Sequence, residues 1–393
     1  MHNKDYVCIG MVGAGRATEL HMHAYVRVSH VPLRFKTIMA RRKEQLEPAK
    51  ELYGFEQLSY DFNELINDPE IDVIDICTPP YVHRDMIKAA MNAGKHVICE
   101  KPLTGYFGEE GDPVPVGTGV SKADMYDSLL QNIDDLRNIV NSSGMKFMYA
   151  ENFIYAPAVV KAAEVISAKK SKVLFIKGEE SLKGSSSPVA GKWSANGGGT
   201  FMRTGTHPLS AALWLKSIES KARGETIVPV SVTAEIGNFT TGLTEYEHRH
   251  IAARPEDVED NGTVIINFSD SSKALIIAND ACLGGSNNYV DLYCNDCNLK
   301  CQLTMNDSML TYMLDEDGMD DVYLSEMLPS KRGWNRPFIA DEVLRGYVDE
   351  IQDFMEAVYF DRTPKSGFDI AYSTAKITYA AYKASELGKR IEL

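Results

Sequence analysis

The stretch VCIGMVGAGRAT, residues 7–18, decides how this 393-residue chain folds. Its first six residues form an apolar run that is typical of a buried strand, and a helical pattern begins near Arg16. Gly13 permits a tight strand-to-helix turn, Gly15 lets a pyrophosphate approach the backbone, and the amino terminus of the helix offers free N–H groups. Thr18 stands where a third Gly or Ala is usual. We therefore interpret the stretch as a dinucleotide-binding turn, with a simple sharp turn as the alternative.

The alternation of strand and helix continues to about residue 150. Strand patterns cover residues 33–39, 73–77, 96–99 and 146–150, and helical patterns cover residues 43–53, 84–93 and 124–143. Repeated β-α units favour a parallel sheet that is covered by helices on both faces. We predict an α/β Rossmann domain over residues 1–150. An inserted loop is expected at about 105–122, where Gly, Pro and acidic residues show no periodicity.

Beyond residue 150 the pattern changes. Strand-like segments lie at residues 173–177, 228–239, 263–268, 273–279 and 289–303, and helical patterns return at 342–359 and 371–387. Short turns between consecutive strands favour an antiparallel sheet. We predict that residues 151–393 form an α+β domain for substrate binding and oligomerisation, with a large, mostly antiparallel, open-faced sheet. The terminal helices are free to pack on the first domain.

Composition excludes several classes of partner. The chain has 41 Lys and Arg against 55 Asp and Glu, a net charge of −14, which would repel phosphate backbones and anionic lipids. We therefore expect no nucleic acid and no membrane as partner. No apolar run approaches the ~20 residues that span a bilayer, and the start of the sequence lacks the apolar core of a secretory signal. We expect a cytoplasmic protein.

The seven cysteines are odd in number and show no framework spacing, which favours reduced thiols. Cys294, Cys297 and Cys301 superficially have the spacing of a metal site, with Cys282 as the nearby fourth candidate. The residues around them read as two strands about a turn at 295–296, so we predict a thiol-bearing hairpin and no metal.

The end of the second strand bears on the choice of cofactor. A site for NAD normally presents Asp or Glu there to the ribose hydroxyls, but this chain has Ala40-Arg41-Arg42-Lys43. Guanidinium groups can pair with the 2′-phosphate of NADP. We slightly favour NADP over NAD, because exposed arginines are also ordinary at the start of a helix.

A more specific signal follows a strand pattern that ends at Cys99, where the triplet Glu100-Lys101-Pro102 stands. Together with the glycine turn, this triplet resembles the Gfo/Idh/MocA family, which includes glucose-fructose oxidoreductase, inositol dehydrogenase and related sugar dehydrogenases. Other residues that carry the resemblance are His21, Ala24, Thr78, Pro79, Pro80, His83 and the run 368–393. The similarity spans nearly the full length and implies an NAD(P)-dependent oxidoreductase.

The resemblance implies two catalytic side chains. Lys101 would lie between the nicotinamide and the substrate and would hydrogen-bond the hydroxyl being oxidised. His207, after the glycine-rich run 197–205, matches the family's histidine, and a neutral imidazole can accept the hydroxyl proton. Arg203 stands where the family usually has Asp, and Ser210 where Asp is frequent. We expect Arg203 to lower the pKa of His207 or to bind an anionic group of the substrate.

Further site residues are expected on the same basis. The expected contacts with the cofactor are Gly13, Ala14, Gly15, Arg16, Ala17, Arg41, Arg42, Thr78, Pro79, His83, Glu100 and Lys101. The expected contacts with the substrate are Arg203, Asn152, Tyr155 and Trp193. Weaker candidates are Glu151, Glu179 and Glu180.

Three hypotheses about function remain open at this point. The first is hydride transfer between the nicotinamide and a secondary hydroxyl of a sugar, sugar derivative or cyclitol. The second is cleavage of a glycoside by transient oxidation, with the nicotinamide recycled. The third is a non-catalytic regulator that senses dinucleotides. We also expect a homodimer or homotetramer that covers the open face of the second sheet.

Overall fold

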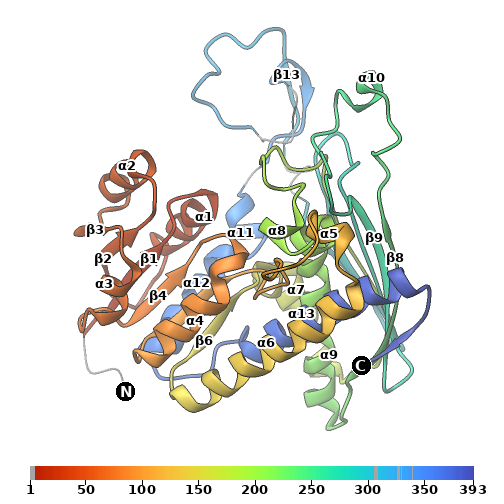
Figure 1. Cartoon of the computed structure of the whole chain (residues 1–393), viewed down its shortest axis with the longest axis horizontal. Helices are drawn as coiled ribbons and strands as arrows, with labels where there is room; N and C mark the ends of the chain where they lie inside the picture. Colours follow the sequence, from red (N-terminus) through yellow and green to blue (C-terminus); the bar gives the residue numbers. More distant parts are fainter. Residues whose placement is uncertain (1–4, 305–308, 325–327, 329, 339) are drawn as a thin grey trace.

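The computed structural model describes residues 5–304, 309–324, 328, 330–338 and 340–393. Two large sheets lie side by side in Figure 1, with the first in red and orange and the second in green and teal. Among the described helices, none combines the length and apolarity needed to cross a bilayer.

The first sheet has six parallel strands in the order β3-β2-β1-β4-β5-β6. The strands are β1 (Val7–Val12), β2 (Leu33–Met39), β3 (Gln57–Ser59), β4 (Val73–Ile76), β5 (His96–Glu100) and β6 (Phe147–Ala150). Every residue of β1 is buried, which explains why this strand reads as an apolar run and not as an alternating pattern. The strand order reverses between β1 and β4, so the crevice at their carboxyl ends is the place where such sheets bind ligands.

Helices cover both faces of this sheet. They are α1 (Arg16–Tyr25), α2 (Lys43–Tyr53), α3 (Phe62–Asn67), the 3₁₀ turn η1 (Pro80–Val82), α4 (His83–Asn92) and α6 (Lys122–Ser143). The predicted α/β Rossmann architecture is confirmed.

The second sheet has seven strands in the order β12-β11-β7-β10-β9-β8-β15. The strands are β7 (Val173–Ser181), β8 (Pro229–Gly237), β9 (Asn261–Phe268), β10 (Lys273–Asn279), β11 (Asn287–Cys294), β12 (Asn298–Gln302) and β15 (Ile391–Glu392). All neighbouring pairs are antiparallel except β7 and β10, so the predicted mostly antiparallel sheet is confirmed. The predicted cysteine hairpin is β11-β12, closed by the Cys294 N–H, which donates to the Cys297 carbonyl.

In the part of the chain that the structure describes, helices pack on one face of the second sheet. The helices α7 (Pro157–Lys169), α9 (Thr206–Arg223) and α13 (Phe368–Leu387) pack on it. Alternation along the strands buries residues such as Ile176 and Ile276 beneath them, while Ile265 and Tyr293 on the other face stay exposed.

The carboxy-terminal helices join the two halves of the molecule. The helix predicted over 342–359 is divided into α11 (Asp341–Leu344) and α12 (Tyr347–Tyr359), because Gly346 adopts a φ of +98°. A Cβ at Gly346 would lie 2.3 Å from the Asn152 carbonyl oxygen, so this break brings the chain close to η2 (Asn152–Tyr155). Helix α12 packs on α1, and α13 packs on α6 as well as on the second sheet.

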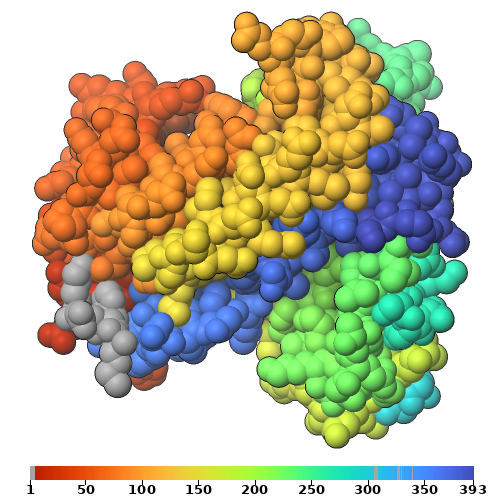
Figure 2. Space-filling model, turned by 60° about the horizontal axis from the view of Figure 1, so that its bottom comes forward, coloured from red at the N-terminus to blue at the C-terminus, as the bar shows by residue number. Residues whose placement is uncertain are grey.

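The segment predicted as an inserted loop crosses between the two halves. Residues 105–122 contain one short helix, α5 (Val116–Gly119), and are otherwise irregular. The Tyr106 N–H donates to the Tyr379 hydroxyl at 2.6 Å, and the Gly117 N–H donates to Asp257 at 2.9 Å. Figure 2 shows this orange segment and the yellow helix α6 lying across the surface beside the blue carboxy-terminal helix.

A small two-stranded sheet stands apart at the top of Figure 1. It pairs β13 (Thr311–Met313) with β14 (Gly333–Asn335). Tyr312 and Trp334, on its surface, are both exposed.

Candidate active site

The glycine turn has the shape that a dinucleotide requires. Gly13 has a φ of +119°, and a Cβ there would lie 2.3 Å from the Cys77 carbonyl oxygen. Gly15 forms the N-cap of α1 without a side-chain hydrogen bond, and a Cβ on it would meet no atom within 4 Å. The backbone at the amino terminus of α1 is therefore open to a phosphate group.

A cavity of about 280 Å³ adjoins this turn. Seven of the residues predicted to contact the cofactor line it: Gly13, Ala14, Gly15, Arg41, Arg42, Thr78 and Pro79. Arg41 donates from its guanidinium to the Tyr81 hydroxyl at 2.9 Å, and Arg42 is the N-cap of α2. A glycine cradle, open amides and two guanidinium groups suit a dinucleotide, so the residues present fit the cofactor.

The other residues predicted to contact the cofactor lie outside this cavity. Arg16 and Lys101 line the neighbouring pocket, while Ala17 packs against the core. His83 is buried, with Nδ1 2.9 Å from the Pro102 carbonyl and Nε2 2.8 Å from the Thr78 carbonyl. The structure therefore corrects the prediction for His83, whose ring nitrogens are occupied in joining two loops.

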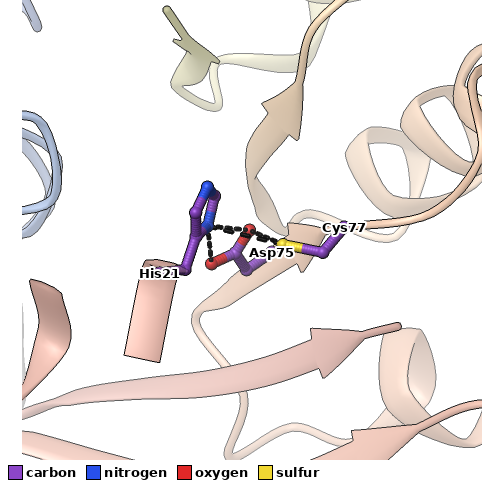
Figure 3. A group of neighbouring side chains, drawn as sticks. All are labelled: His21, Asp75 and Cys77. Carbon is purple, nitrogen blue, oxygen red and sulfur yellow. Dashed lines mark hydrogen bonds and ion pairs between the residues drawn. The ribbon is translucent and has the colours of Figure 1, made fainter. Parts of the chain in front are cut away.

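Figure 3 shows part of a buried polar network, the side chains of His21, Asp75 and Cys77. His21 Nδ1 lies 2.9 Å from Asp75, and its Nε2 lies 3.3 Å from Glu100 Oε1. Glu100 Oε2 accepts a hydrogen bond from the Lys101 N–H at 2.9 Å. Burial lowers the pKa of His21, but Asp75 and Cys77 outweigh it and hold that pKa well above its ordinary value. The network thus fixes the backbone that carries Lys101.

The donor atoms of His21, Asp75 and Cys77 lie within 4.8 Å of one another, a spacing that could also hold a metal ion. Asp75 instead takes hydrogen bonds from the side chains around it, including the Tyr25 hydroxyl at 2.9 Å. We therefore interpret the cluster as a hydrogen-bonded network that supports the Glu100-Lys101-Pro102 loop.

A second pocket, of about 430 Å³, opens between the two halves of the molecule. Its lining includes Lys101 from the loop after β5, His207 from the first turn of α9, and Glu180 from β7. Lys101 Nζ donates to the Arg203 carbonyl at 2.5 Å. The chain thus brings a lysine, a histidine and a carboxylate that are far apart in the sequence into one pocket.

The imidazole of His207 is held on two sides. Its Nδ1 lies 2.6 Å from Glu151 Oε1, and its ring stacks on Phe153 with 4.9 Å between centroids. Its Nε2 faces Glu180 Oε2 at 3.9 Å. The contacts with Glu151 and Phe153 thus orient Nε2 of His207 toward the pocket.

Burial dominates the electrostatics of this pocket. It lowers the pKa of His207 well below the ordinary value, with the charges of Lys101 and Arg345 acting in the same direction. It also raises the pKa of Glu151 well above the ordinary value and that of Glu180 to about 7. These opposite shifts favour the carboxyl group of Glu151 over His207 as the carrier of a shared proton.

Arg203, a predicted substrate contact, already has a charged partner within the protein. It lines the pocket, but its guanidinium forms an ion pair with Asp280, whose other oxygen accepts from the Thr200 hydroxyl at 2.9 Å. Burial, Lys101 and Arg345 cause the low pKa of His207, and Arg203 is not among these causes.

Three predicted substrate contacts are also corrected, because their side chains lie in the interior with other partners. The Tyr155 hydroxyl donates to Asp353 at 2.8 Å, and Asn152 Nδ2 donates to the Arg345 carbonyl at 3.0 Å. Trp193 is 2% exposed and donates from Nε1 to the Tyr106 carbonyl at 2.9 Å.

Sequence reasoning missed Asp341 and Arg345, which form an ion pair at the wall of the pocket. No motif surrounds them, and they reach the pocket because the chain passes close to η2 at Gly346. Glu151 and Glu180 were only weak candidates, although both contact or face His207.

Comparison with known proteins agrees with this geometry. A family model described as an oxidoreductase family with an NAD-binding Rossmann fold, GFO_IDH_MocA, matches residues 7–109. Levoglucosan dehydrogenase of Pseudarthrobacter phenanthrenivorans is 26% identical over 399 residues, which cover 96% of this chain and 95% of that protein. Residues 7–109 thus match the Gfo/Idh/MocA family model, and the similarity to a levoglucosan dehydrogenase extends over nearly the whole chain.

Two further comparisons extend this result. Myo-inositol 2-dehydrogenase of Thermotoga maritima is 34% identical over 96 residues, 24% of this chain and 28% of that protein. The crystal structure of GenD2 from gentamicin A biosynthesis, in complex with NAD, shares the fold with a TM-score of 0.77 at 19% identity, covering 100% of this chain and 98% of that one. The chain is an oxidoreductase with an NAD-binding Rossmann fold, and it is similar to dehydrogenases that act on CH–OH groups.

Proposed function

We propose that this oxidoreductase transfers hydride between the nicotinamide of NAD(P) and a secondary hydroxyl of a sugar, a sugar derivative or a cyclitol. The observation that carries the proposal is the convergence of Lys101 and His207 on one pocket at the carboxyl edge of the first sheet. The similarity to levoglucosan dehydrogenase and myo-inositol 2-dehydrogenase supports a carbohydrate-like substrate.

The cofactor would lie along the glycine turn, with its pyrophosphate at Gly13, Ala14 and Gly15 and its adenosine end toward Arg41 and Arg42. These residues line the cavity beside α1. The bound nicotinamide supplies the hydride acceptor or donor. We propose NADP in preference to NAD, because no carboxylate among the residues that line the cavity would repel a 2′-phosphate.

Lys101 acts on the oxygen of the reacting hydroxyl. Its ammonium group is held by the Arg203 carbonyl at 2.5 Å and retains two further N–H donors. A hydrogen bond from one of them stabilises the negative charge that develops on the oxygen during oxidation. His207 presents Nε2 from a ring that Glu151 and Phe153 immobilise, and so positions the substrate beside Lys101.

The proposal is tested by incubating the protein with NAD or NADP and a panel of polyols, monosaccharides and anhydrosugars, while the absorbance of the reduced cofactor is followed. We expect turnover of at least one cyclic polyol, and loss of that turnover in Lys101→Met. A panel that stays silent with both cofactors, with every substrate recovered unchanged, would contradict the proposal.

One observation favours cleavage of a glycoside as a second candidate. The pocket continues past Arg203 and Ser185 into a cavity of about 140 Å³ beside Ser186, Ser187 and Arg254, which leaves room for a group attached to the reacting sugar. Product analysis separates the two reactions. Aglycone released without net formation of reduced cofactor would support cleavage, and reduced cofactor equal to the oxidised product would support the dehydrogenase.

A further inference from the structure

Glu180, on the wall of the pocket, has a buried oxygen without a hydrogen-bond partner among the described residues. Its side chain is 3% exposed, and Oε2 accepts no hydrogen bond from the described residues. Alternation along β7 directs Glu180 toward the pocket, whereas its neighbour Glu179 lies on the other face of the sheet. A buried carboxylate oxygen without a donor is costly, so a bound molecule is expected to supply one.

The adjacent strand repeats this feature. Asn288 on β11 pairs with Glu180 across the sheet, lines the same pocket and is also 3% exposed. Its Oδ1 has no hydrogen-bond donor among the described residues. Two unpartnered acceptors therefore lie side by side on the wall of the pocket, an arrangement that suits neighbouring hydroxyl groups of a polyol.

The other groups in the pocket are poorly placed to take a proton from the substrate. His207 Nδ1 is occupied by Glu151 at 2.6 Å, and burial together with Lys101 and Arg345 lowers the pKa of the imidazole. Arg203 occupies the position where a carboxylate was expected, and it is paired with Asp280. The pocket thus has hydrogen-bond donors and a weakened histidine, but still needs a base.

Burial and the charges that face Glu180 together bring the pKa of its carboxyl group close to neutral pH. Burial raises its pKa to about 7, while Lys101, Arg345 and Arg203 oppose that effect and Asp341 adds to it. A carboxyl group with such a pKa can both accept and return a proton near neutral pH.

We infer that Glu180 is the catalytic acid-base residue of the hydride transfer, in the place of the carboxylate that position 203 lacks. The inference rests on the proposed function. In the oxidation direction the O–H bond of the substrate breaks and its proton goes to Glu180 Oε2. The C–H bond breaks with its electron pair, which leaves as hydride to the bound nicotinamide, and the carbon–oxygen bond becomes double. Reduction follows the reverse path.

The test compares Glu180→Gln, which keeps the shape but cannot take the proton, with the wild type. We expect kcat for polyol oxidation to fall about 100-fold or more. We expect KM to change by no more than about threefold, because the amide still accepts a hydrogen bond. The acidic limb of the kcat profile near pH 7 should disappear. Glu180→Asp should restore part of kcat together with an acidic limb.

Asn288→Ala is the matched control, because it removes the neighbouring acceptor without changing the charge. It should raise KM and leave the acidic limb in place. The inference is overturned if Glu180→Gln keeps kcat within about threefold of the wild type with the same acidic limb.

A second readout does not need turnover. Infrared difference spectra of the wild-type protein, recorded across pH without substrate, should show a carboxyl group that titrates near pH 7 and is lost in Glu180→Gln. Absence of that signal would overturn the role of Glu180 whether or not any polyol is oxidised. A silent substrate panel with the signal present would count against the proposed function and not against the ionisation of Glu180.

Discussion

Lys101 Nζ donates a 2.5 Å hydrogen bond to the backbone carbonyl of Arg203, a residue 102 positions later in the chain. The bond crosses the pocket from the loop after β5 to the π-helical turn η3 (Phe201–Gly205). Because a main-chain oxygen holds the ammonium group, the side chain of Arg203 is free to pair with Asp280. The position of Lys101 thus depends on the backbone of the second domain and not on the side chain at position 203.

The first prediction concerns Lys101→Met, which removes the ammonium group while keeping much of the apolar stem. We expect kcat to fall about 10²- to 10³-fold, because the developing oxyanion loses its hydrogen-bond donor. Dinucleotide affinity, measured by fluorescence titration, should change little, since the glycine turn lies in a separate cavity. Lys161→Met, at a position 70% exposed on α7, is the control and should leave both quantities unaltered. Full activity in Lys101→Met would remove Lys101 from the chemistry.

The second prediction concerns the choice of cofactor. Arg42→Ala should raise KM for NADP about 10- to 100-fold, the effect of losing a charge-assisted hydrogen bond to the 2′-phosphate. KM for NAD should change much less. Arg42 is the better test than Arg41, because Arg41 also holds the Tyr81 hydroxyl. Lys43→Ala, on the exposed side of α2, is the control. Equal changes in both KM values would show that no 2′-phosphate is recognised at Arg42.

The part of the fold that the sequence predicted best is the part that depends on local pattern. The apolar run of β1 and the turn at Gly13 are determined by neighbours in the sequence, because a strand buried on both faces and a positive φ each demand particular residue types. The same holds for the β11-β12 hairpin. Lys101 and His207 were predicted only through the family resemblance, since no periodicity relates them.

The features of the site that the sequence did not predict depend on contacts between distant segments of the chain. Arg203 pairs with Asp280, 77 residues later, and Arg345 lies at the pocket beside α12, which packs on α1 of the first domain. Trp193 was predicted as a substrate contact because it lies in a loop-rich stretch. Nothing in that stretch shows that its indole turns inward to meet the Tyr106 carbonyl.

The third prediction concerns assembly through the uncovered face of the second sheet. Ile265 on β9 is 39% exposed and lies opposite Leu275 on β10, and Phe175 and Tyr293 pack beside each other on β7 and β11 with ring centroids 5.9 Å apart. An apolar face of this kind favours a second copy of the chain as its cover. Sedimentation at micromolar concentration should show a homodimer or homotetramer.

Ile265→Glu should shift that assembly toward monomer, because it places a charge in the middle of the face. Leu52→Glu is the matched control, at a position 75% exposed on α2, and should leave the assembly intact. A wild-type protein that sediments only as a monomer would rule out the interface.

The fourth prediction uses the opposite pKa shifts of Glu151 and His207. Burial raises the first and lowers the second, so the folded pair carries its proton on Glu151, whereas the unfolded chain carries it on the histidine between about pH 4.5 and 6.5. Both states then bind the same number of protons, and the pair adds no slope to the free energy of unfolding in that range.

Replacing either member of the pair should reveal how the pKa shift of the other member makes the free energy of unfolding depend on pH. In Glu151→Gln only the lowered pKa of His207 remains. The free energy of unfolding should then fall, relative to wild type, as the pH drops below about 6.5, because the histidine of the unfolded chain gains a proton there. In His207→Gln only the raised pKa of Glu151 remains. The free energy of unfolding should then fall, relative to wild type, as the pH rises above about 4.5, because the carboxyl group of the unfolded chain loses its proton there. Urea unfolding at a series of pH values measures both differences. If the two differences had the same sign, the folded protein would not hold the shared proton on Glu151.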